Sequence, residues 1–278
     1  MIQLNNLSYV YPNGFTALEN ITMELTPGIY LLLGENGAGK TTLLHLIGGL
    51  RKAVPQQSCT LDGVPTGSRL PSVLSRTFVQ TDDIKFPFGN IDMMVKYHAP
   101  FYPSFSPEML RQNLDDYGMT GVEHLDRFSL GNRRKAQLAY VLALRPDVLL
   151  LDEPANGLDI SSRQTLLYQM ARCVGPEQTV IISTHTVWDF KNLFDGVMVL
   201  SRGRLVLKAD IADLTERISF VSGSEPFENA FFMQQNLGQY QAIVPNDGTM
   251  QTDIDYALLY NAMHSPAAST IANYLNQI

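Results

Sequence analysis

A glycine-rich stretch that ends in lysine and threonine has the residue types needed to hold a phosphate chain. Residues 34–41 read GENGAGKT and fit the pattern G-x-x-x-x-G-K-[ST] in full. Glycines let backbone N–H groups wrap phosphates without a clash at Cβ, and the N-terminus of the following helix adds a positive end. The pattern predicts that Lys40 reaches the β- and γ-phosphates and that the Thr41 hydroxyl ligates Mg²⁺. The predicted nucleotide-binding residues here are Gly34, Asn36, Gly37, Ala38, Gly39, Lys40, Thr41 and Thr42.

Two adjacent carboxylates follow a second apolar run. Val148 to Leu151 reads as a buried strand, and Asp152 and Glu153 come directly after it. A strand that ends in Asp can hold the Mg²⁺ shell, and Glu153 is then placed to polarise an attacking water. The alternative, in which both carboxylates cap the next helix, is disfavoured by the phosphate-binding loop elsewhere in the chain.

These residues need a parallel sheet to bring them together. Ile29 to Leu33 is a compact apolar strand before the glycine-rich stretch, and a helix is expected from about Lys40 to Leu46. This strand–loop–helix order is typical of an α/β domain and disfavours a chance glycine turn. The run from Val180 to Ser183 is a further strand of the kind buried in parallel sheets. Ligand sites in such sheets lie beyond the carboxyl ends of the strands.

The chain changes character along its length. Residues 1–27 read as alternating short strands with a turn at 12–14, and residues 83–145 favour helices. In that helical region, Ser106 precedes Pro107 as a helix start, and Ser129 is a candidate N-cap of a helix that continues to about Leu144. Apolar positions 138, 141 and 142 would give the latter helix a buried stripe. After about Arg202, a final strand and a helix are expected before a small segment of mixed type.

Composition narrows the class of protein. The chain is 45% hydrophobic and 17% charged, which is ordinary for a globular protein. Residues 213–278 carry seven acidic residues and one basic residue, so this segment is a poor candidate for binding nucleic acid or anionic lipid. The apolar runs are too short to span a bilayer, and the N-terminus lacks the pattern of a signal peptide. Cys59 and Cys173 have no metal-type spacing and are expected to be packing residues in a reducing compartment.

The order of these motifs resembles the ATPases of ABC transporters. LLLDEP at 149–154 and GLD at 157–159 look like the Walker B motif and D-loop of that family, and the resemblance extends over about residues 1–212. It implies that Tyr11 stacks on adenine, and that Gln80 senses Mg²⁺ and water as a catalytic and metal-site residue. It also implies that His185 contacts the γ-phosphate, while Asp152 and Thr41 hold the metal. Tyr11, Gln80 or His185 alone would be a weak signal.

The family's signature, typically LSGGQ, aligns with residues 128–132, FSLGN. In the family this loop binds the γ-phosphate held by another subunit, so the resemblance implies that Ser129, Gly131 and Asn132 complete the ATP site of a second copy or a related partner. Leu130 replaces the first glycine and narrows the backbone freedom of the loop. Such variants resemble the cassettes of drug and peptide exporters.

Two other clusters have competing interpretations. The basic run at residues 133–135 lies in the first turns of a helix, where a solvated or phosphate-facing role is favoured over a nucleic-acid patch. Aromatic and proline residues at 86–88 and 101–103 either pack the helical region or form the surface that receives a membrane subunit.

The combined prediction is an α/β protein with a P-loop NTPase sheet core, an N-terminal antiparallel β part, a helical lobe at about 83–145 and a C-terminal accessory segment from 213. The resemblance implies an ATP- and Mg²⁺-dependent ATPase that dimerises and powers a transmembrane permease from the cytoplasmic face, with export of drugs, peptides or lipids favoured. The alternatives are an ABC ATPase outside transport, as in ribosome rescue, DNA repair or cofactor assembly, and a regulatory module that does not turn over ATP. The sequence leaves the transported substrate open.

Overall fold

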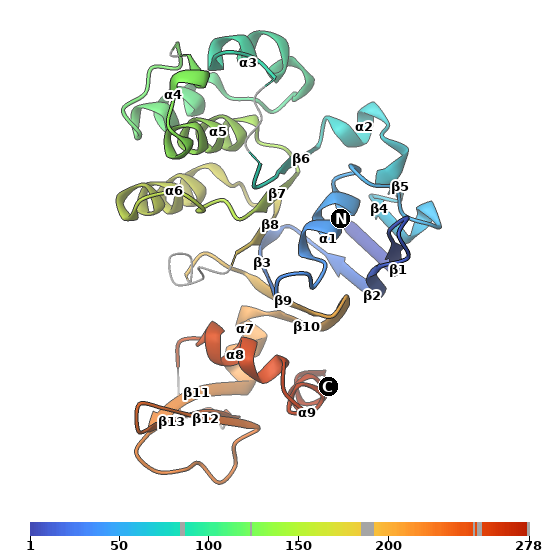
Figure 1. Ribbon diagram of the computed structural model, residues 1–278, viewed down its shortest axis with the longest axis vertical. Helices are drawn as coiled ribbons and strands as arrows, with labels where there is room; N and C mark the ends of the chain where they lie inside the picture. The colour runs from blue at the N-terminus through green and yellow to red at the C-terminus, as the bar shows by residue number, and fades with distance from the viewer. Residues whose placement is uncertain (84–86, 123, 185–191, 247, 249–251, 277–278) are drawn as a thin grey trace.

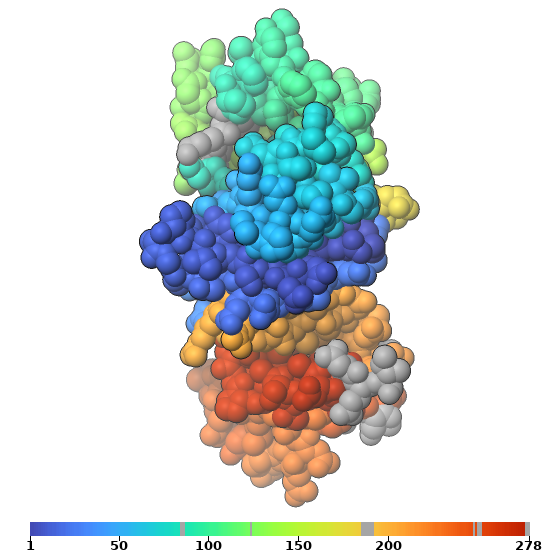
Figure 2. Space-filling model, turned by 90° about the vertical axis from the view of Figure 1, so that its right-hand side faces the viewer, coloured from blue at the N-terminus to red at the C-terminus, as the bar shows by residue number. Residues whose placement is uncertain are grey.

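The computed structural model describes residues 1–83, 87–122, 124–184, 192–246, 248 and 252–276 (Figure 1). The molecule is elongated, with a helical lobe at one end, the six-stranded and four-stranded sheets in the middle and the C-terminal segment with its own small sheet at the other end (Figure 1, Figure 2). No helix in these described ranges combines the length and the hydropathy needed to cross a bilayer.

Six strands form the central sheet in the order β10-β9-β3-β8-β7-β6. They are β3 (Gly28–Gly34), β6 (Thr77–Gln80), β7 (Val148–Asp152), β8 (Thr179–Ser183), β9 (Gly196–Ser201) and β10 (Arg204–Asp210). The strands from β9 to β6 are parallel, and β10 pairs antiparallel with β9 at one edge. The three apolar runs predicted as buried strands are confirmed as parts of β3, β7 and β8.

Strands β3, β7, β8 and β9 are buried on both faces, because a separate hydrophobic core lies on each side of the sheet. In β7, Leu149 and Leu151 point into one core, while Val148 and Leu150 point into the other. This alternation explains why the strands read as continuous apolar runs instead of alternating with polar residues. Cys59 and Cys173 are buried free thiols in different cores, as their predicted packing roles require.

An antiparallel sheet covers one side of the molecule, in the order β2-β1-β4-β5. Its strands are β1 (Ile2–Val10), β2 (Thr16–Leu25), β4 (Cys59–Leu61) and β5 (Val64–Pro65). Core and exposed positions alternate along β2, so one face of this sheet packs inward. The predicted N-terminal antiparallel part is therefore confirmed, and the predicted turn lies between β1 and β2.

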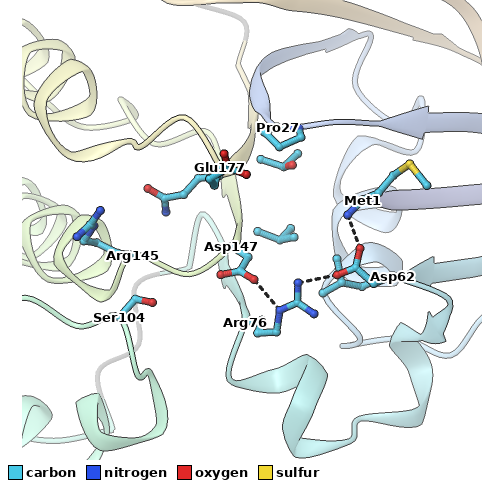
Figure 3. Close-up of a pocket in the computed structure, with 12 residues that line it drawn as sticks. Met1, Pro27, Asp62, Arg76, Ser104, Arg145, Asp147 and Glu177 are labelled. Carbon is cyan, nitrogen blue, oxygen red and sulfur yellow. Dashed lines mark hydrogen bonds and ion pairs between the residues drawn. The ribbon is translucent and has the colours of Figure 1, made fainter.

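Ion pairs tie the antiparallel sheet to the amino ends of the central strands (Figure 3). Arg76 lies just before β6 and donates to Asp62, in the turn between β4 and β5, and to Asp147, just before β7, with both distances 2.6 Å. The Met1 amino group also donates to Asp62 at 2.6 Å. Hydrogen bonds from the Met1 amino group and from Arg76 lower the pKa of Asp62. These residues line a cavity of about 540 Å³ at the edge of the sheet opposite the glycine-rich loop.

The helical lobe is inserted between β6 and β7, as predicted. Its helices are α3 (Ile91–Tyr97), α4 (Pro107–Asp115) and α5 (Leu130–Leu144), and α6 (Ile160–Cys173), which follows β7, packs against α5. Side chains of Asn90, Ser106 and Ser129 cap α3, α4 and α5 by accepting backbone N–H bonds. The helix start at Ser106-Pro107 is confirmed. Positions 138, 141 and 142 of α5 are buried as predicted, but they do not form a separate stripe, because every residue from 136 to 144 is buried.

The strand and helix predicted after Arg202 are confirmed as β10, at the edge of the central sheet, and α7 (Ile211–Arg217), which leads into the C-terminal segment. It continues with a three-stranded antiparallel sheet and two helices. These elements are β11 (Ile218–Gly223), β12 (Phe232–Asn236), β13 (Gln239–Pro245), α8 (Tyr256–Met263) and α9 (Ala268–Asn276). Leu259 and Met263 of α8 belong to the same core as Val197 and Val199 of β9. The domain boundary at residue 213 stays a prediction.

The remaining helices are short apart from α1 (Lys40–Ile47), which follows the glycine-rich loop. They are α2 (Pro71–Leu74) and the 3₁₀ turns η1 (Gln56–Ser58), η2 (Thr66–Ser68), η3 (Ala99–Phe101) and η4 (Leu125–Arg127). At the end of α1, Gly48 packs directly against Val79 of β6 and Leu150 of β7. The position of α1 on the sheet therefore depends on the absence of a side chain at residue 48.

We predict that Gly48→Ala destabilises the protein by about 1–3 kcal/mol, the usual cost of overpacking. The added methyl group would overlap Val79, whose branched side chain has little freedom to turn away, and it would press on the Leu44 carbonyl oxygen. Thermal unfolding of the two proteins measures the effect as a lower Tm. Gly89→Ala is the matched control, because a methyl group there would meet nothing within 4 Å. Equal Tm values for Gly48→Ala and the control would contradict this account of α1 packing.

Candidate functional site

A cavity of about 340 Å³ opens where the glycine-rich loop meets the carboxyl ends of the central strands. Its lining brings together residues that are distant in the sequence. They are Tyr11, Phe15, Ala17, Asn36, Gly37, Gly39, Lys40, Thr41, Thr42, Asp82, Asp152 and Glu153. Nine of these were predicted as site residues, and Phe15, Ala17 and Asp82 were not. The topology accounts for the convergence, since β3, β7 and β6 all end at this edge.

Two glycines of the loop are required by their surroundings. Gly39 has a φ of 104°, and a Cβ at this position would lie 2.6 Å from the Ala17 carbonyl oxygen and from Leu18 Cδ2. A Cβ at Gly34 would lie 2.6 Å from the Leu200 carbonyl oxygen. The loop is therefore pressed against both β2 and β9. Gly39 is the N-cap of α1 and has no side chain to bond the first helical N–H groups, which leaves these groups for a ligand.

Lys40 lies at the mouth of this loop with its ammonium on backbone oxygens. Lys40 Nζ donates to the carbonyl oxygens of Gly34 at 2.6 Å and Glu35 at 3.2 Å. Burial lowers the pKa of Lys40, and the negative charges of Glu153, Asp152 and Glu35 oppose that change. The result is a partly desolvated cation, and it is this ammonium that favours an anionic ligand, against the repulsion of the nearby carboxylates.

The chain joins the predicted metal ligands directly. The Thr41 hydroxyl donates to Asp152 Oδ2 at 2.6 Å, which links α1 to the end of β7, and Asp152 is buried. No three His, Cys, Asp or Glu residues of the described chain gather as an all-protein metal cage. Mg²⁺ does not need one, because it takes one or two protein ligands and completes its shell with phosphate oxygens and water. The hydroxyl and carboxylate oxygens therefore fit Mg²⁺.

Glu153 occupies a backbone conformation that side chains other than glycine seldom adopt. Its φ is 49°, and its N–H donates to the Ser183 carbonyl oxygen of β8 at 2.8 Å. Left-handed non-glycine residues cluster at functional sites, where the surrounding structure stabilises them. This turn directs the chain out of β7 immediately after Asp152 and places Glu153 at the cavity.

Tyr11 forms one wall of the cavity and is fixed from two sides. Its hydroxyl lies 2.9 Å from Thr42 Oγ1, and the guanidinium carbon of Arg51 lies 4.7 Å from the centre of its ring. Arg51 also donates to the Tyr9 hydroxyl at 3.3 Å. Phe15 lies beside Tyr11 with 6.3 Å between ring centres. Sequence reasoning missed Arg51, because its contact depends on how β1 lies beside the end of α1.

Gln80 is at the end of β6, beside Leu151 of β7, and is fully buried. Neither polar atom of its side chain has a hydrogen-bond partner among the described residues, and Gln80 is not part of the cavity lining. An unpaired buried amide costs about 1–3 kcal/mol, so a partner for this group would be stabilising. Its predicted catalytic and metal-site roles stay predictions. The predicted His185 lies outside the described residues.

The predicted signature residues lie away from the cavity of their own chain. Ser129 caps α5 by accepting the Asn132 N–H at 3.3 Å, and Leu130 is 66% exposed. Gly131 approaches the loop after β7, since a Cβ there would lie 3.1 Å from the Gly157 carbonyl oxygen. The signature loop therefore lies against the 157–159 loop, and the cavity lining includes no residue of either loop.

The predicted solvated or phosphate-facing role is wrong for Arg134, which is 3% exposed and bonds to residues 81 and 82. The cause is a tertiary contact that helical position alone does not reveal. Arg133 donates to the Asp126 carbonyl oxygen, and Lys135 pairs with Asp159. Among the aromatics, Phe88 stacks on Tyr97 with ring centres 5.4 Å apart.

The remaining aromatics differ in burial, and the interpretation that they receive a membrane subunit stays a prediction. Tyr102 packs against the core, while Phe101 is 68% exposed. Phe86 lies outside the described residues. Packing therefore accounts for part of the cluster, and Phe101 presents an apolar ring to solvent.

A family model for the ABC transporter matches residues 18–156, half of the 278-residue chain. The matched segment contains the glycine-rich loop, the signature loop and both carboxylates at the end of β7. The chain therefore belongs to the ABC transporter family. It is an ATP-binding subunit of that family, and as such an ATPase.

Individual relatives agree with this assignment. YcbN, an uncharacterized ABC transporter ATP-binding protein of Bacillus subtilis (strain 168), is 28% identical in a match that covers 100% of this chain and 90% of YcbN. EcfA2, an energy-coupling factor transporter ATP-binding protein of Streptococcus sanguinis (strain SK36), is 31% identical, with 79% and 85% covered. The structure of cbiO1 from Clostridium perfringens, part of the ABC transporter complex cbiONQ, has a TM-score of 0.60 at 25% identity and covers 75% of this chain and 88% of cbiO1. The predicted α/β P-loop fold is confirmed.

We predict that Arg51→Ala raises the KM for ATP about two- to fivefold and changes kcat less, because a cation–π contact contributes about 0.5–1 kcal/mol. Arg51 holds the Tyr11 ring from behind, so its loss weakens the wall against which the base would stack. Steady-state ATPase kinetics measure both constants. Lys52→Ala, a change at the exposed neighbouring residue, is the control. An unchanged KM in Arg51→Ala would show that the contact has no role in nucleotide binding.

Proposed function

We propose that this protein is the ATP-hydrolysing subunit of an ABC transporter that closes as a dimer around ATP and powers a separate transmembrane subunit. The observation that carries the proposal is the cavity in which Lys40, the Thr41–Asp152 pair and Glu153 converge. Each group has a defined task in phosphoryl transfer to water. The cavity also has an aromatic wall, Tyr11, of the kind on which a purine base stacks.

Binding of the triphosphate is assigned to the glycine-rich loop and Lys40. The loop N–H groups and the N-terminus of α1 face the cavity, and the Lys40 ammonium is free to exchange its carbonyl partners for phosphate oxygens. Thr41 and Asp152 would hold Mg²⁺, which when bound neutralises charge on the β- and γ-phosphate oxygens. Their 2.6 Å contact supports this assignment, because it brings the hydroxyl and carboxylate oxygens together.

Glu153 is assigned as the residue that polarises the attacking water. Its carboxylate lies at the cavity one residue beyond Asp152, and the strained backbone fixes its direction. Gln80 and His185 are proposed to sense the γ-phosphate and water, as the resemblance to the family implies. The buried, unpaired amide of Gln80 supports that role, since it has hydrogen-bonding capacity to spare.

The signature loop supports a dimer. Ser129, Gly131 and Asn132 do not line the cavity of their own chain, and the N-terminus of α5, a feature that attracts anions, lies outside that cavity. A second subunit arranged head to tail would bring this loop to the other nucleotide. The second subunit is either an identical copy or a related ATPase.

The transmembrane partner and the direction of transport extend the proposal. EcfA2 and cbiO1 carry names that link them to transporter complexes, which supports a permease partner for this chain. Through that partner the protein would lie at the cytoplasmic face of the membrane. We propose export of drugs, peptides or lipids, on the support of the Ser129-Leu130-Gly131 variant of the signature. Copurification with the membrane subunit would identify the partner. Transport assays in vesicles of both orientations would then measure the direction of transport, and import of the substrate would contradict the proposed export.

We predict that Glu153→Gln keeps ATP binding but lowers kcat at least about 100-fold, because the amide cannot accept a proton from water. Phosphate release measures turnover, and binding of a fluorescent ATP analogue measures affinity. Glu177→Gln is the control, since Glu177 lines the cavity at the opposite edge of the sheet. Near wild-type hydrolysis by Glu153→Gln would remove Glu153 from the mechanism.

A further inference from the structure

A carboxylate that the known motifs do not include lies in the nucleotide cavity. Asp82 follows Gln80 by two residues, just after β6, and lines the cavity together with Asp152 and Glu153. A triphosphate is strongly anionic, so a third uncompensated carboxylate would repel it and compete for Mg²⁺. The structure compensates this charge from the helical lobe.

Arg134 reaches Asp82 from the second turn of α5. Its Nη2 donates to Asp82 Oδ1 at 2.7 Å and to the Asp82 carbonyl oxygen at 2.6 Å, and its Nη1 donates to the Thr81 carbonyl oxygen at 3.4 Å. The side chain is 3% exposed. Burying a charged guanidinium away from water costs free energy unless a charged partner compensates for the lost hydration. Asp82 is that partner for Arg134.

The same carboxylate also binds the loop that carries Glu153. Asn156 Nδ2 lies 3.2 Å from Asp82 Oδ1 and 3.4 Å from Asp82 Oδ2, and the Asn156 N–H donates to the Glu153 carbonyl oxygen at 3.1 Å. Asp82 therefore connects three elements at one point: the segment after β6, the signature helix α5 and the loop after β7.

We infer that Arg134 is a positioning residue of the ATP site. It neutralises Asp82 and holds that carboxylate back from the phosphates, and through Asp82 and Asn156 it keeps α5 in register with the loop of Glu153. This inference rests on the proposed ATPase function and adds a residue to it. Arg134 touches neither the nucleotide-binding loop nor the reacting atoms, so it acts through Asp82.

A double-mutant cycle with Arg134→Met and Asp82→Asn tests the inference. We expect Arg134→Met to weaken MgATP binding about tenfold or more, because the Asp82 carboxylate at the cavity then loses its cationic partner and repels the phosphates. In the Asp82→Asn background, the same change should cost at most about threefold, since no charge remains to compensate. Arg133→Met, which removes a neighbouring guanidinium that binds the Asp126 carbonyl oxygen, is the control.

The outcomes separate the inference from the proposed function. If the wild-type chain does not bind MgATP, the proposed function itself fails. If it binds MgATP and Arg134→Met weakens binding equally in both backgrounds, or not at all, Arg134 has only a packing role and the inference is overturned.

Arg134→Lys keeps the test valid if Arg134→Met does not fold. A lysine ammonium retains the positive charge. It cannot donate to the Asp82 carboxylate and to the carbonyl oxygens of Thr81 and Asp82 in the fixed geometry of a guanidinium. We therefore expect its MgATP affinity to stay within about threefold of wild type while kcat falls about tenfold. Loss of MgATP affinity in folded Arg134→Lys would contradict the charge-compensation role.

Discussion

Negative charge at one edge of the central sheet is the constraint on which the site depends. Asp152, Glu153 and Asp82 all line the cavity that we propose as the site of ATP, itself a polyanion. Two cations offset this charge from opposite sides. Lys40 is partly desolvated on the carbonyl oxygens of its own loop, where burial lowers its pKa against the pull of nearby carboxylates. Arg134 is buried behind Asp82. Backbone N–H groups at the start of α1 add positive potential without adding a titratable group.

The antiparallel sheet is a structural wall of this site. A side chain at Gly39 would strike Ala17 at the start of β2, so the phosphate-binding loop is shaped against that strand. The turn before β2 supplies Tyr11, which Arg51 holds from the end of α1. The two cores on the faces of the central sheet fix these parts relative to one another, because β3 and β7 send alternate side chains into each core.

Local rules in the sequence predicted the elements that carry the chemistry. The run before the glycine-rich loop, the proline after Ser106 and the N-cap Ser129 each determine their structure within a few residues, and all three are confirmed. The contacts of Arg134 and Arg51 could not be predicted in this way, because their partners lie 52 and 40 positions away in the chain. A basic run on a helix indicates solvent exposure only where no carboxylate from a distant part of the chain pairs with it. Here Asp82 pairs with Arg134. The role of Asp82 likewise follows from where β6 ends in the sheet.

The C-terminal segment belongs to the same physical unit as the site. Its helix α8 buries Leu259 and Met263 against β9, and β9 is the strand that prevents a side chain at Gly34. The turn between β9 and β10 continues this contact, since the Gly203 N–H donates to the Ala38 carbonyl oxygen at 3.2 Å. Burial, with the nearby charge of Glu35, raises the pKa of Tyr260 on α8. Removing the segment would therefore expose the apolar face of β9, the strand that packs against Gly34 of the glycine-rich loop.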